Sequence, residues 1–517
     1  MSKVTPVDFF IKTDECYTIF MILIRGAEII DGTGKNPFKA DVLIRKNRLS
    51  AIGNFPNHKA ELIIDGLGSV LTPGFIDVNT SSDHYLGLLT DPEQKDFLLQ
   101  GVTTIIGGNC GSSLAPLLYG TLESVRKWAD TNKINVNWQT MREFLVLLEK
   151  RGLGVNFGTL VGHSTIRRAL IGESLRDLTV KELAVFTSIL EEALGQGALG
   201  FSTGLGYAHS RGVPYEEIRI LASAVAKMHG VYATHLRDEK EDVGVSVAET
   251  IRLGRDTGIK ILISHFRPLL GFENYFSEAL EILDKNCEGL SIYFDSYPSD
   301  TSLVPIYTLL PEWAKNGGLE VMLKNLRAQN LKERILKALP ALKARDLIIA
   351  QAPRAPYLVG RTLGEIAENL EVDLSSAVLK IMEATKMRAV IFYRNINMDF
   401  AIQSLAHNAA LIASNSSSFD HGSMHIRHER IMNTFPKFLE VVSQTKLMPL
   451  SRAIEKITSM PAKIFNLAER GAIKEGNIAD LTMSKDGTVT NVFVGGSLAV
   501  KDGVFQNILA GKVLRSS

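Results

Sequence analysis

The chain has 517 residues, of which 45% are apolar and 22% are charged, and its formal net charge is +1. This composition is ordinary for a globular protein, and a chain of this length can bury a large core. The nearly balanced charge gives no electrostatic field that would favour binding to nucleic acid or to an anionic membrane, so we expect neither as a partner. Partners therefore have to be inferred from a site.

The cysteine content and the N-terminus indicate the compartment. The three cysteines, Cys16, Cys110 and Cys287, are too few for a disulfide scaffold. No apolar run approaches the roughly 20 residues that span a bilayer. Residues 1–20 lack the apolar region of a secretory signal, and we interpret them as an N-terminal extension. A reducing, cytoplasmic location is the expectation that follows.

Both ends of the chain read as short β-strands. Residues 21–70 contain apolar runs that turn at Asp31-Gly32 and Gly34, followed by a second pair of strands around a polar turn. Residues 479–483 and 489–496 have the same character, with a hairpin predicted at Gly495-Gly496. We therefore predict one β-rich domain built from both chain ends, residues 21–70 plus 466–517.

The middle of the chain, residues 71–465, alternates short apolar strands with longer amphipathic helices. This pattern predicts βαβ units and a parallel sheet. The eight strand candidates are residues 71–78, 102–107, 155–161, 198–202, 230–235, 259–265, 290–294 and 409–414. Eight units indicate a closed (β/α)8 barrel of the TIM type, whose catalytic groups lie at the carboxyl ends of the strands. Residues 301–400 are long for one connection and predict an inserted helical lobe over the barrel mouth.

Several residues that suit a metal ion follow these strands. Cys110 comes after the second strand, His163 after the third, His235 after the fifth and His265 after the sixth. A thiolate and two imidazoles are good zinc ligands, and a catalytic zinc keeps a position open for water. A lone cysteine or histidine is more often a structural core residue. Their joint placement at strand ends nevertheless favours a metal site.

Longer motifs then carry a resemblance to a known family. They are residues 71–77, 100–116, 197–207, 232–239, 458–463 and 470–481. In these segments and in their order, the sequence resembles the N-acyl-D-amino-acid deacylases (D-aminoacylases) of the amidohydrolase superfamily, from about residue 21 to the C-terminus. The resemblance implies an α/β fold in which a (β/α)8 barrel carries a small β-sandwich built from both chain ends.

The resemblance also implies a ligand set. In the family one Zn2+ is held by a cysteine and two histidines, which are Cys110, His235 and His265 here, so one zinc per chain is expected. The family grips the α-carboxylate of its substrate with tyrosines and basic residues. The matching positions are Tyr207, Arg267 (for the family's usual lysine), Tyr297 and Arg430. We also expect His163, which follows the third strand, to contact the substrate. A planar guanidinium suits a carboxylate, although its reach differs from that of lysine.

Three departures from the family pattern concern the catalytic machinery. The His-x-His motif after the first strand is replaced by Asn79 and Ser81, whose neutral oxygens are poor zinc ligands, so we expect no second metal. The aspartate that acts as general base after the eighth strand is replaced by Asn415, which cannot accept a proton near neutral pH. The family's His-Pro-Arg reads His-Glu429-Arg430.

A substitute base could come from the segment that follows the eighth strand. Its candidates are Asp420, His425 and Glu429, and Asp83 and His84 after the first strand are also near. For any one of these residues, a solvated loop charge is the simpler interpretation. The loss of a general base typically costs about 10²–10⁴-fold in rate, so the question decides whether the chain is active.

Two functions remain open at this stage. The first is a metal-dependent amidohydrolase that hydrolyses a non-peptide C–N bond, deacylating an N-acyl (D-)amino acid whose free carboxylate the clamp would hold. The alternative is a catalytically impaired pseudo-enzyme that binds a carboxylated small molecule. A different amidohydrolase reaction, such as ring opening or deamination, is a weaker third possibility. The acyl group, the side chain and the oligomeric state are not predicted.

Overall fold

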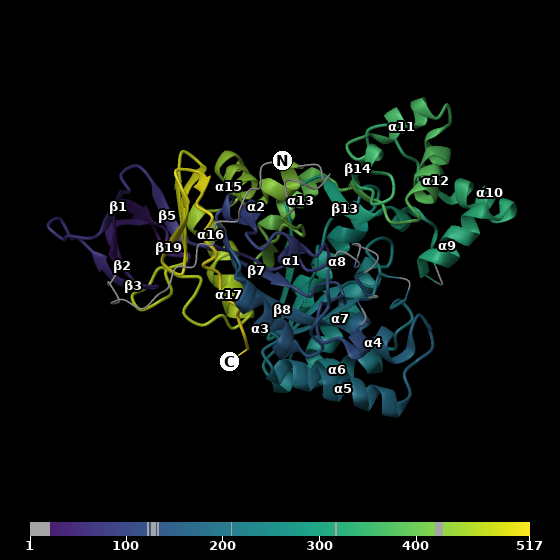
Figure 1. The fold of residues 1–517 in the computed structure, drawn as a ribbon, viewed down its shortest axis with the longest axis horizontal. Helices are drawn as coiled ribbons and strands as arrows, with labels where there is room; N and C mark the ends of the chain where they lie inside the picture. Colours follow the sequence, from purple (N-terminus) through teal and green to yellow (C-terminus); the bar gives the residue numbers. More distant parts are fainter. Residues whose placement is uncertain are drawn as a thin grey trace, which may run out of the picture.

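The computed structural model describes residues 21–120, 122, 124–125, 131, 134–207, 209–315, 318–418 and 428–516. Its centre is an eight-stranded parallel sheet (Figure 1). The strands are, in chain order, β6 (Phe75–Asp77), β7 (Val102–Gly107), β8 (Asn156–Gly162), β9 (Gly200–Gly204), β10 (Val231–His235), β11 (Lys260–Ile263), β12 (Ile292–Ser296) and β16 (Ala410–Ile412). Each strand pairs with the next one in this order, which confirms the predicted barrel class.

The sheet closes beyond the ends of its first and last strands. Past β16, the backbone N–H of Asn415 donates to the carbonyl of Asn79 at 2.9 Å. The N–H of Ser81 donates in return to the carbonyl of Ser416 at 2.7 Å. These two bonds join the segments that follow β6 and β16, so the carboxyl ends of all eight strands surround one space.

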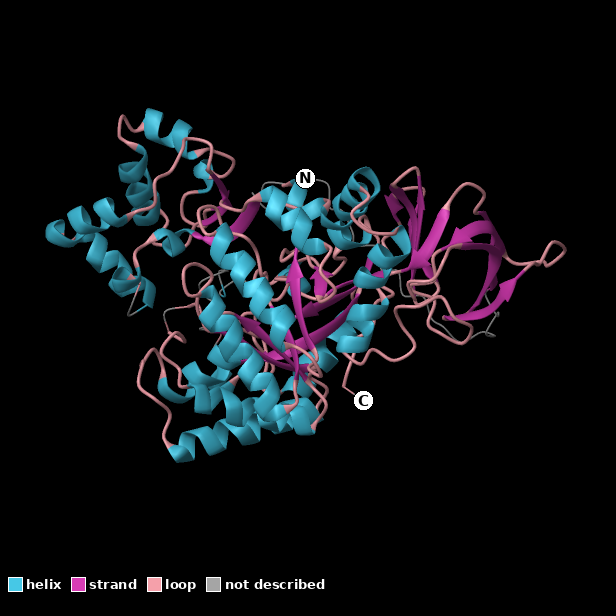
Figure 2. Cartoon of the chain, turned by 180° about the vertical axis from the view of Figure 1, so that it is seen from behind, coloured by secondary structure: helices cyan, strands magenta, loops and turns pink. Residues whose placement is uncertain are grey.

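Amphipathic helices cover the outside of this sheet (Figure 2). They are α3 (Met141–Arg151), α4 (His163–Ile171), α5 (Val180–Gly195), α6 (Tyr215–Lys227), α7 (Val243–Thr257), α8 (Glu273–Asn286), α13 (Met398–Leu405), α15 (Thr434–Thr445), α16 (Leu450–Ile457) and α17 (Ser459–Ile464). Shorter helices are α1 (Gly87–Thr90), α2 (Lys95–Leu98) and α14 (Glu429–Met432). Capping boxes at Thr140 and Thr179 fix where α3 and α5 begin, because each satisfies two backbone donors at the helix start.

The two ends of the chain form one nine-stranded sheet beside the barrel. Its strands are β1 (Met21–Ile29), β2 (Phe38–Arg45), β3 (Arg48–Gly53), β4 (Leu62–Asp65), β5 (Val70–Pro73), β17 (Leu481–Lys485), β18 (Thr488–Val494), β19 (Ser497–Lys501) and β20 (Val504–Phe505). The N-terminal and C-terminal halves meet where β5 pairs with β17, and Figure 1 shows the purple and yellow strands side by side. The hairpin predicted at Gly495-Gly496 joins β18 to β19.

The structure corrects the first predicted strand. Residues 71–78 do not form one element, because β5 belongs to the antiparallel sheet and β6 to the barrel. The chain changes sheets at Gly74, whose N–H donates to the carbonyl of Asp480 at 2.8 Å. A Cβ at this position would lie 2.2 Å from Oγ1 of Thr103, so only glycine fits between the two sheets.

Residues 301–394 form a lobe that contains a small sheet of its own. The sequence predicts helices in this segment and no sheet. The antiparallel strands β13 (Thr301–Pro305), β15 (Val390–Arg394) and β14 (Leu347–Gln351) lie beside α9 (Gly318–Arg327), α10 (Gln329–Ala338), α11 (Leu363–Asn369) and α12 (Leu374–Ala384). The lobe has an apolar cluster of its own and projects from the barrel in both views (Figures 1 and 2). Within the described residues, no helix is both long enough and apolar enough to cross a membrane.

The close approach at Gly74 generates a stability prediction. We expect Gly74→Ala to lower the free energy of unfolding by about 1–3 kcal/mol, because the new methyl group would force apart Thr103 and the strand junction. The measurement is the urea midpoint and slope. The control is Gly212→Ala, where a Cβ meets nothing within 4 Å. Equal midpoints for the two variants would contradict the packing argument.

Candidate metal centre

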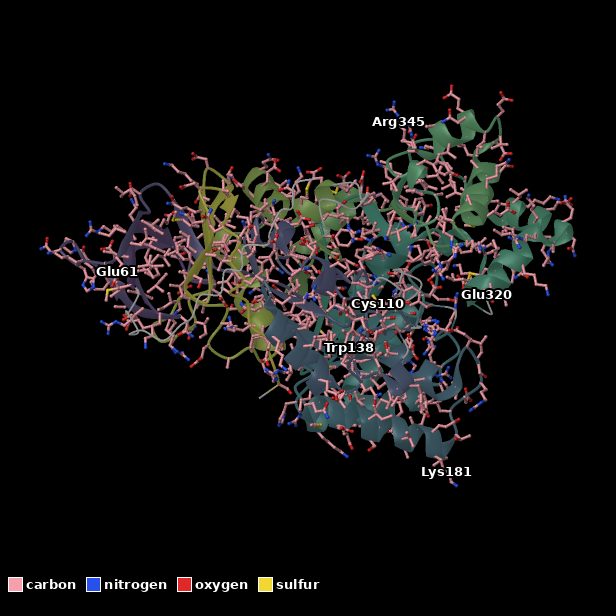
Figure 3. All side chains as sticks on the ribbon, viewed as in Figure 1. Glu61, Cys110, Trp138, Lys181, Glu320 and Arg345 are labelled. Carbon is pink, nitrogen blue, oxygen red and sulfur yellow. The ribbon has the colours of Figure 1, made fainter. Side chains whose placement is uncertain are left out.

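Three strand ends bring a thiol and two imidazoles together. Cys110 follows β7, His235 is the last residue of β10, and His265 lies just beyond β11. One potential ligand atom from each lies within 4.8 Å of the other two. The Sγ atom of Cys110 is 3.5 Å from Nε2 of His265, and the two imidazole centroids are 4.4 Å apart. Figure 3 labels Cys110 near the middle of the molecule.

The backbone is constrained where these groups enter the site. Cys110 has φ of 52°, His265 has φ of 39° and Asn415 has φ of 45°. A left-handed conformation at a non-glycine residue costs roughly 1–2 kcal/mol and persists only where the surroundings impose it. Three such residues at one edge of the barrel indicate that the strand ends are shaped for a site.

The donor set fits a zinc ion. Nδ1 of His265 donates to Oε1 of Glu239 at 3.0 Å, which leaves Nε2 directed toward Cys110. Nδ1 of His235 is buried and has no hydrogen-bond partner among the described residues. Burial and the neighbouring His235 lower the pKa of His265 to about 4, so its imidazole is neutral at physiological pH. Neutral imidazoles and a thiol that can ionise are the groups that bind zinc.

Glu239 belongs to this centre, although no role was predicted for it from the sequence. Its Oε2 lies 3.5 Å from Nε2 of His235 and 3.4 Å from a guanidinium nitrogen of Arg267. Burial opposes the charged form, but Arg267 and the two imidazoles outweigh burial and hold the pKa of Glu239 well below its ordinary value. The available signal was its position four residues after His235, in the motif at residues 232–239. A carboxylate behind a ligating imidazole fixes its tautomer and orientation.

Asn79, which replaces the first histidine of the family's His-x-His motif, forms a hydrogen bond within the protein. The Nδ2 of Asn79 donates to Oδ2 of Asp295 at 3.1 Å, and Oδ1 of Asp295 accepts the backbone N–H of His265 at 2.8 Å. Asp77 accepts the backbone N–H groups of Asn79 and Ser414. Burial raises the pKa of both aspartates to about 7. Asn79 therefore joins β6 to β12 in place of a ligand.

The residues expected to bind a substrate carboxylate lie at different depths. Tyr207 and Arg267 line the cavity above the centre, whereas Tyr297 and Arg430, 1% and 3% exposed, are not among its lining residues. A guanidinium nitrogen of Arg267 donates to the Tyr297 hydroxyl at 2.9 Å. The Arg430 guanidinium covers the Tyr297 ring at 4.2 Å and donates to the carbonyl of Asn415 at 3.1 Å. Tyr297 and Arg430 thus support the wall from behind.

His163 lies outside this arrangement. Its side chain is completely buried, and its Nε2 is 2.8 Å from Oε1 of Glu217. The ring packs against Phe186 and Phe201, and burial lowers its pKa. His163 is not among the residues that line the cavity, and its contacts are those of a structural core histidine.

The position that carries the family's general base and the three candidates for its replacement differ in where they lie relative to the cavity. Asn415 lines the cavity at the position where the family carries aspartate. Glu429 is exposed at the start of α14 and is not a lining residue. Asp420 and His425 lie outside the described residues.

The cavity above the centre has a volume of about 1150 Å³. Its floor is formed by the strand ends, and its far wall comes from the 301–394 lobe, including Tyr307, Leu310 and Met322. Small-molecule sites typically occupy about 300–1,000 Å³, so the space accommodates an amino acid with a substantial substituent.

The chain is similar in sequence and in fold to known proteins. A model of the amidohydrolase family matches residues 395–499. A D-aminoacylase of Alcaligenes xylosoxydans xylosoxydans is 29% identical over 514 residues, which cover 96% of this chain and 97% of that relative. An N-acyl-D-glutamate deacylase of Bordetella bronchiseptica, solved with zinc and a phosphonate mimic of the tetrahedral intermediate, has a TM-score of 0.79 at 26% identity and covers 96% of this chain and 100% of its own.

A second solved structure has a comparable similarity. It is a D-aminoacylase with a binuclear metal centre, for which activation by one metal and attenuation by the second are described. Its TM-score is 0.78 at 27% identity, over 96% of this chain and 99% of that one. Together these similarities confirm the resemblance seen in the motifs and the fold of barrel plus β-sandwich.

The buried aspartates predict a pH-dependent stability. Asp77 has its pKa raised from 3.8 to about 7, so its contribution to stability is complete below the ordinary pKa and is lost as the pH rises through 7. In protein stripped of metal, we expect Asp77→Asn to reduce the fall in the free energy of unfolding between about pH 5 and pH 8. Urea denaturation at both pH values measures this fall, with exposed Asp486→Asn as control. Parallel pH curves for wild type and Asp77→Asn would refute the assignment.

Proposed function

We propose that this chain, a homologue of the D-aminoacylases, is a metal-dependent amidohydrolase that removes the acyl group from an N-acyl-D-amino acid. The observation that carries the proposal is the convergence of Cys110, His235 and His265 in a cavity that also contains the Arg267 guanidinium. These groups supply what hydrolysis of a carboxylated amide requires, namely a metal site and an anchor for the carboxylate.

Cys110, His235 and His265 would hold one zinc ion, and Glu239 would orient His265 from behind. A zinc ion in such a site polarises the carbonyl of the amide and makes a water molecule acidic enough to attack it. A single ion is favoured because Asn79 is bonded to Asp295 and offers no imidazole. The one-metal activation described for the related D-aminoacylase supports this count.

The protein's own residues bind and orient the substrate. Arg267 is held by Glu239 on one side and by the Tyr297 hydroxyl on the other, so its guanidinium is fixed before a ligand arrives. A preorganised guanidinium binds a planar carboxylate through two parallel hydrogen bonds. With the carboxylate at Arg267, the amide would lie over the Cys–His–His set and the acyl group would extend toward the lobe.

The free thiols of Cys110 and Cys287 support a reducing, cytoplasmic setting.

Metal content provides the first test. We expect about one zinc per wild-type chain by elemental analysis, and loss of the metal in Cys110→Ala because the thiolate is one of three protein ligands. Cys287→Ala is the matched control, since this thiol lies at the end of α8, outside the cavity. Wild-type protein that binds no zinc in zinc-supplemented buffer would argue against the metal site.

Carboxylate recognition provides the second test. With a panel of N-acetyl-D-amino acids, we expect Arg267→Met to raise KM by about 10–100-fold, the value of one lost charge-assisted hydrogen-bonding partner. Arg394→Met is the control, because Arg394 lines the same cavity but pairs with Asp300. Zinc content is measured for each variant. Ligand binding by zinc-loaded wild type with no product from any substrate would instead favour the pseudo-enzyme.

A further inference from the structure

Glu239 lies where the candidate metal centre meets the candidate carboxylate anchor. Its Oε1 accepts from Nδ1 of His265 at 3.0 Å, and its Oε2 lies 3.5 Å from Nε2 of His235. The same Oε2 lies 3.4 Å from Nη2 of Arg267. One carboxylate thus contacts both imidazoles and the guanidinium, and all four side chains line the same cavity.

Each imidazole keeps its second ring nitrogen for a metal. Nε2 of His265 is 3.5 Å from Sγ of Cys110. Nδ1 of His235 is buried and has no hydrogen-bond partner among the described residues. A carboxylate on one ring nitrogen makes the other nitrogen a better metal ligand. The negative charge of Glu239 therefore favours zinc binding at this set.

The contact with Glu239 is the weaker of the two that hold the Arg267 guanidinium. Nη1 donates to the Tyr297 hydroxyl at 2.9 Å, whereas the 3.4 Å from Nη2 to Glu239 is long beside the roughly 2.7–2.9 Å of a charge-assisted hydrogen bond. Nε of Arg267 is buried and has no hydrogen-bond partner within the part of the chain that the structure describes. Nε and Nη2 form one edge of the guanidinium, which suits a carboxylate with two parallel hydrogen bonds. A ligand carboxylate on this edge would compete with Glu239 for Nη2.

The charges of the site favour binding of both ligands together. Without a metal, the opposite charges of Glu239 and Arg267 offset each other. A divalent ion held with the Cys110 thiolate adds net positive charge, which attracts an anionic ligand. An anion on Arg267 in turn leaves the charge of Glu239 to the imidazoles. Each ligand is therefore expected to tighten the binding of the other by the same factor, as thermodynamic linkage requires.

We propose that Glu239 is a positioning residue that couples zinc binding to carboxylate binding, an inference that rests on the metal site and the carboxylate anchor of the proposed function. With a carboxylate on Arg267, Glu239 pairs with the imidazoles of His235 and His265, and zinc is bound more tightly. Without a ligand, Glu239 is shared with Arg267, and zinc is bound less tightly. The protein thus binds its metal most tightly when substrate is present.

The test measures the zinc affinity of the full-length protein by competition with a fluorescent chelator, with and without excess 4-methylpentanoate. This probe has the carboxylate and the side chain of leucine but no amide, so it is not hydrolysed. The chelator is calibrated in the same concentration of probe. In wild type we expect the probe to tighten zinc binding by at least about fivefold, the lower end of typical coupling between two sites. A smaller increase would overturn the proposal.

Glu239→Gln separates coupling from structural support. Glutamine still offers an amide oxygen to Nδ1 of His265 but carries no negative charge. We expect weaker zinc binding and a probe effect below about half of the wild-type factor. Glu241→Gln, at an exposed glutamate that lines the same cavity, is the matched control and keeps the wild-type factor. A factor above half of the wild-type value in Glu239→Gln would sink the idea, because a merely supporting residue lowers zinc affinity equally with and without the probe.

Arg267→Met tests the route of the coupling. We expect the probe to change its zinc affinity by less than about twofold, because the coupling passes through the guanidinium. A larger effect would show that the carboxylate acts on the metal directly, against the proposal. Should Glu239→Gln fail to fold or to bind zinc, Glu239→Asp takes its place with the same expectation, since its carboxylate is one methylene shorter. Loss of zinc by both variants would make Glu239 a support for the centre alone and overturn the coupling.

Turnover of N-acetyl-D-amino acids distinguishes this inference from the proposed function. Coupling in wild type without product from any of these substrates would support the role of Glu239 and overturn the deacylase function. Turnover without coupling would overturn the role of Glu239 alone. Absence of zinc binding by wild type would overturn both.

Discussion

The site depends on the closure of the barrel at the carboxyl ends of its strands. Two backbone hydrogen bonds between the segments after β6 and β16, from Asn415 to Asn79 and from Ser81 to Ser416, complete the circle. Because a parallel barrel directs every strand end to the same face, this closure places residues more than 300 positions apart around one cavity. Cys110, His265 and Asn415, each with a left-handed backbone conformation, lie on that rim.

One continuous chain of charged and polar contacts runs from the cavity lining into the wall behind it. Glu239 contacts both imidazoles and Arg267, Arg267 donates to Tyr297, and Arg430 covers the Tyr297 ring and reaches the Asn415 carbonyl. Glu239 is the carboxylate in this set, and it remains charged despite its burial because Arg267 and the two imidazoles stabilise its negative charge. Glu239 therefore physically connects the two imidazoles of the candidate metal centre to Arg267, the candidate carboxylate anchor.

The departures from the family pattern fall on one side of the site. The β10 and β11 ends keep their imidazoles, whereas the β6 and β16 ends have exchanged histidine and aspartate for neutral polar residues. Asn79 now donates to Asp295, so the exchanged side has become a hydrogen-bonded wall instead of a second metal site.

The amino-acid sequence was enough to predict the class of fold, seven of the eight barrel strands and the convergence of Cys110, His235 and His265 at strand ends, because strand periodicity and the position of a residue after a strand are local properties of the chain. It did not show that residues 71–78 divide between two sheets, since that depends on a glycine packed against Thr103. Nor did it show that Tyr297 and Arg430 lie behind Arg267, that His163 is a core residue, or that Glu239 contacts both imidazoles of the centre. Those facts depend on side-chain direction and on contacts between distant segments, which exist only once the chain has folded and the barrel has closed.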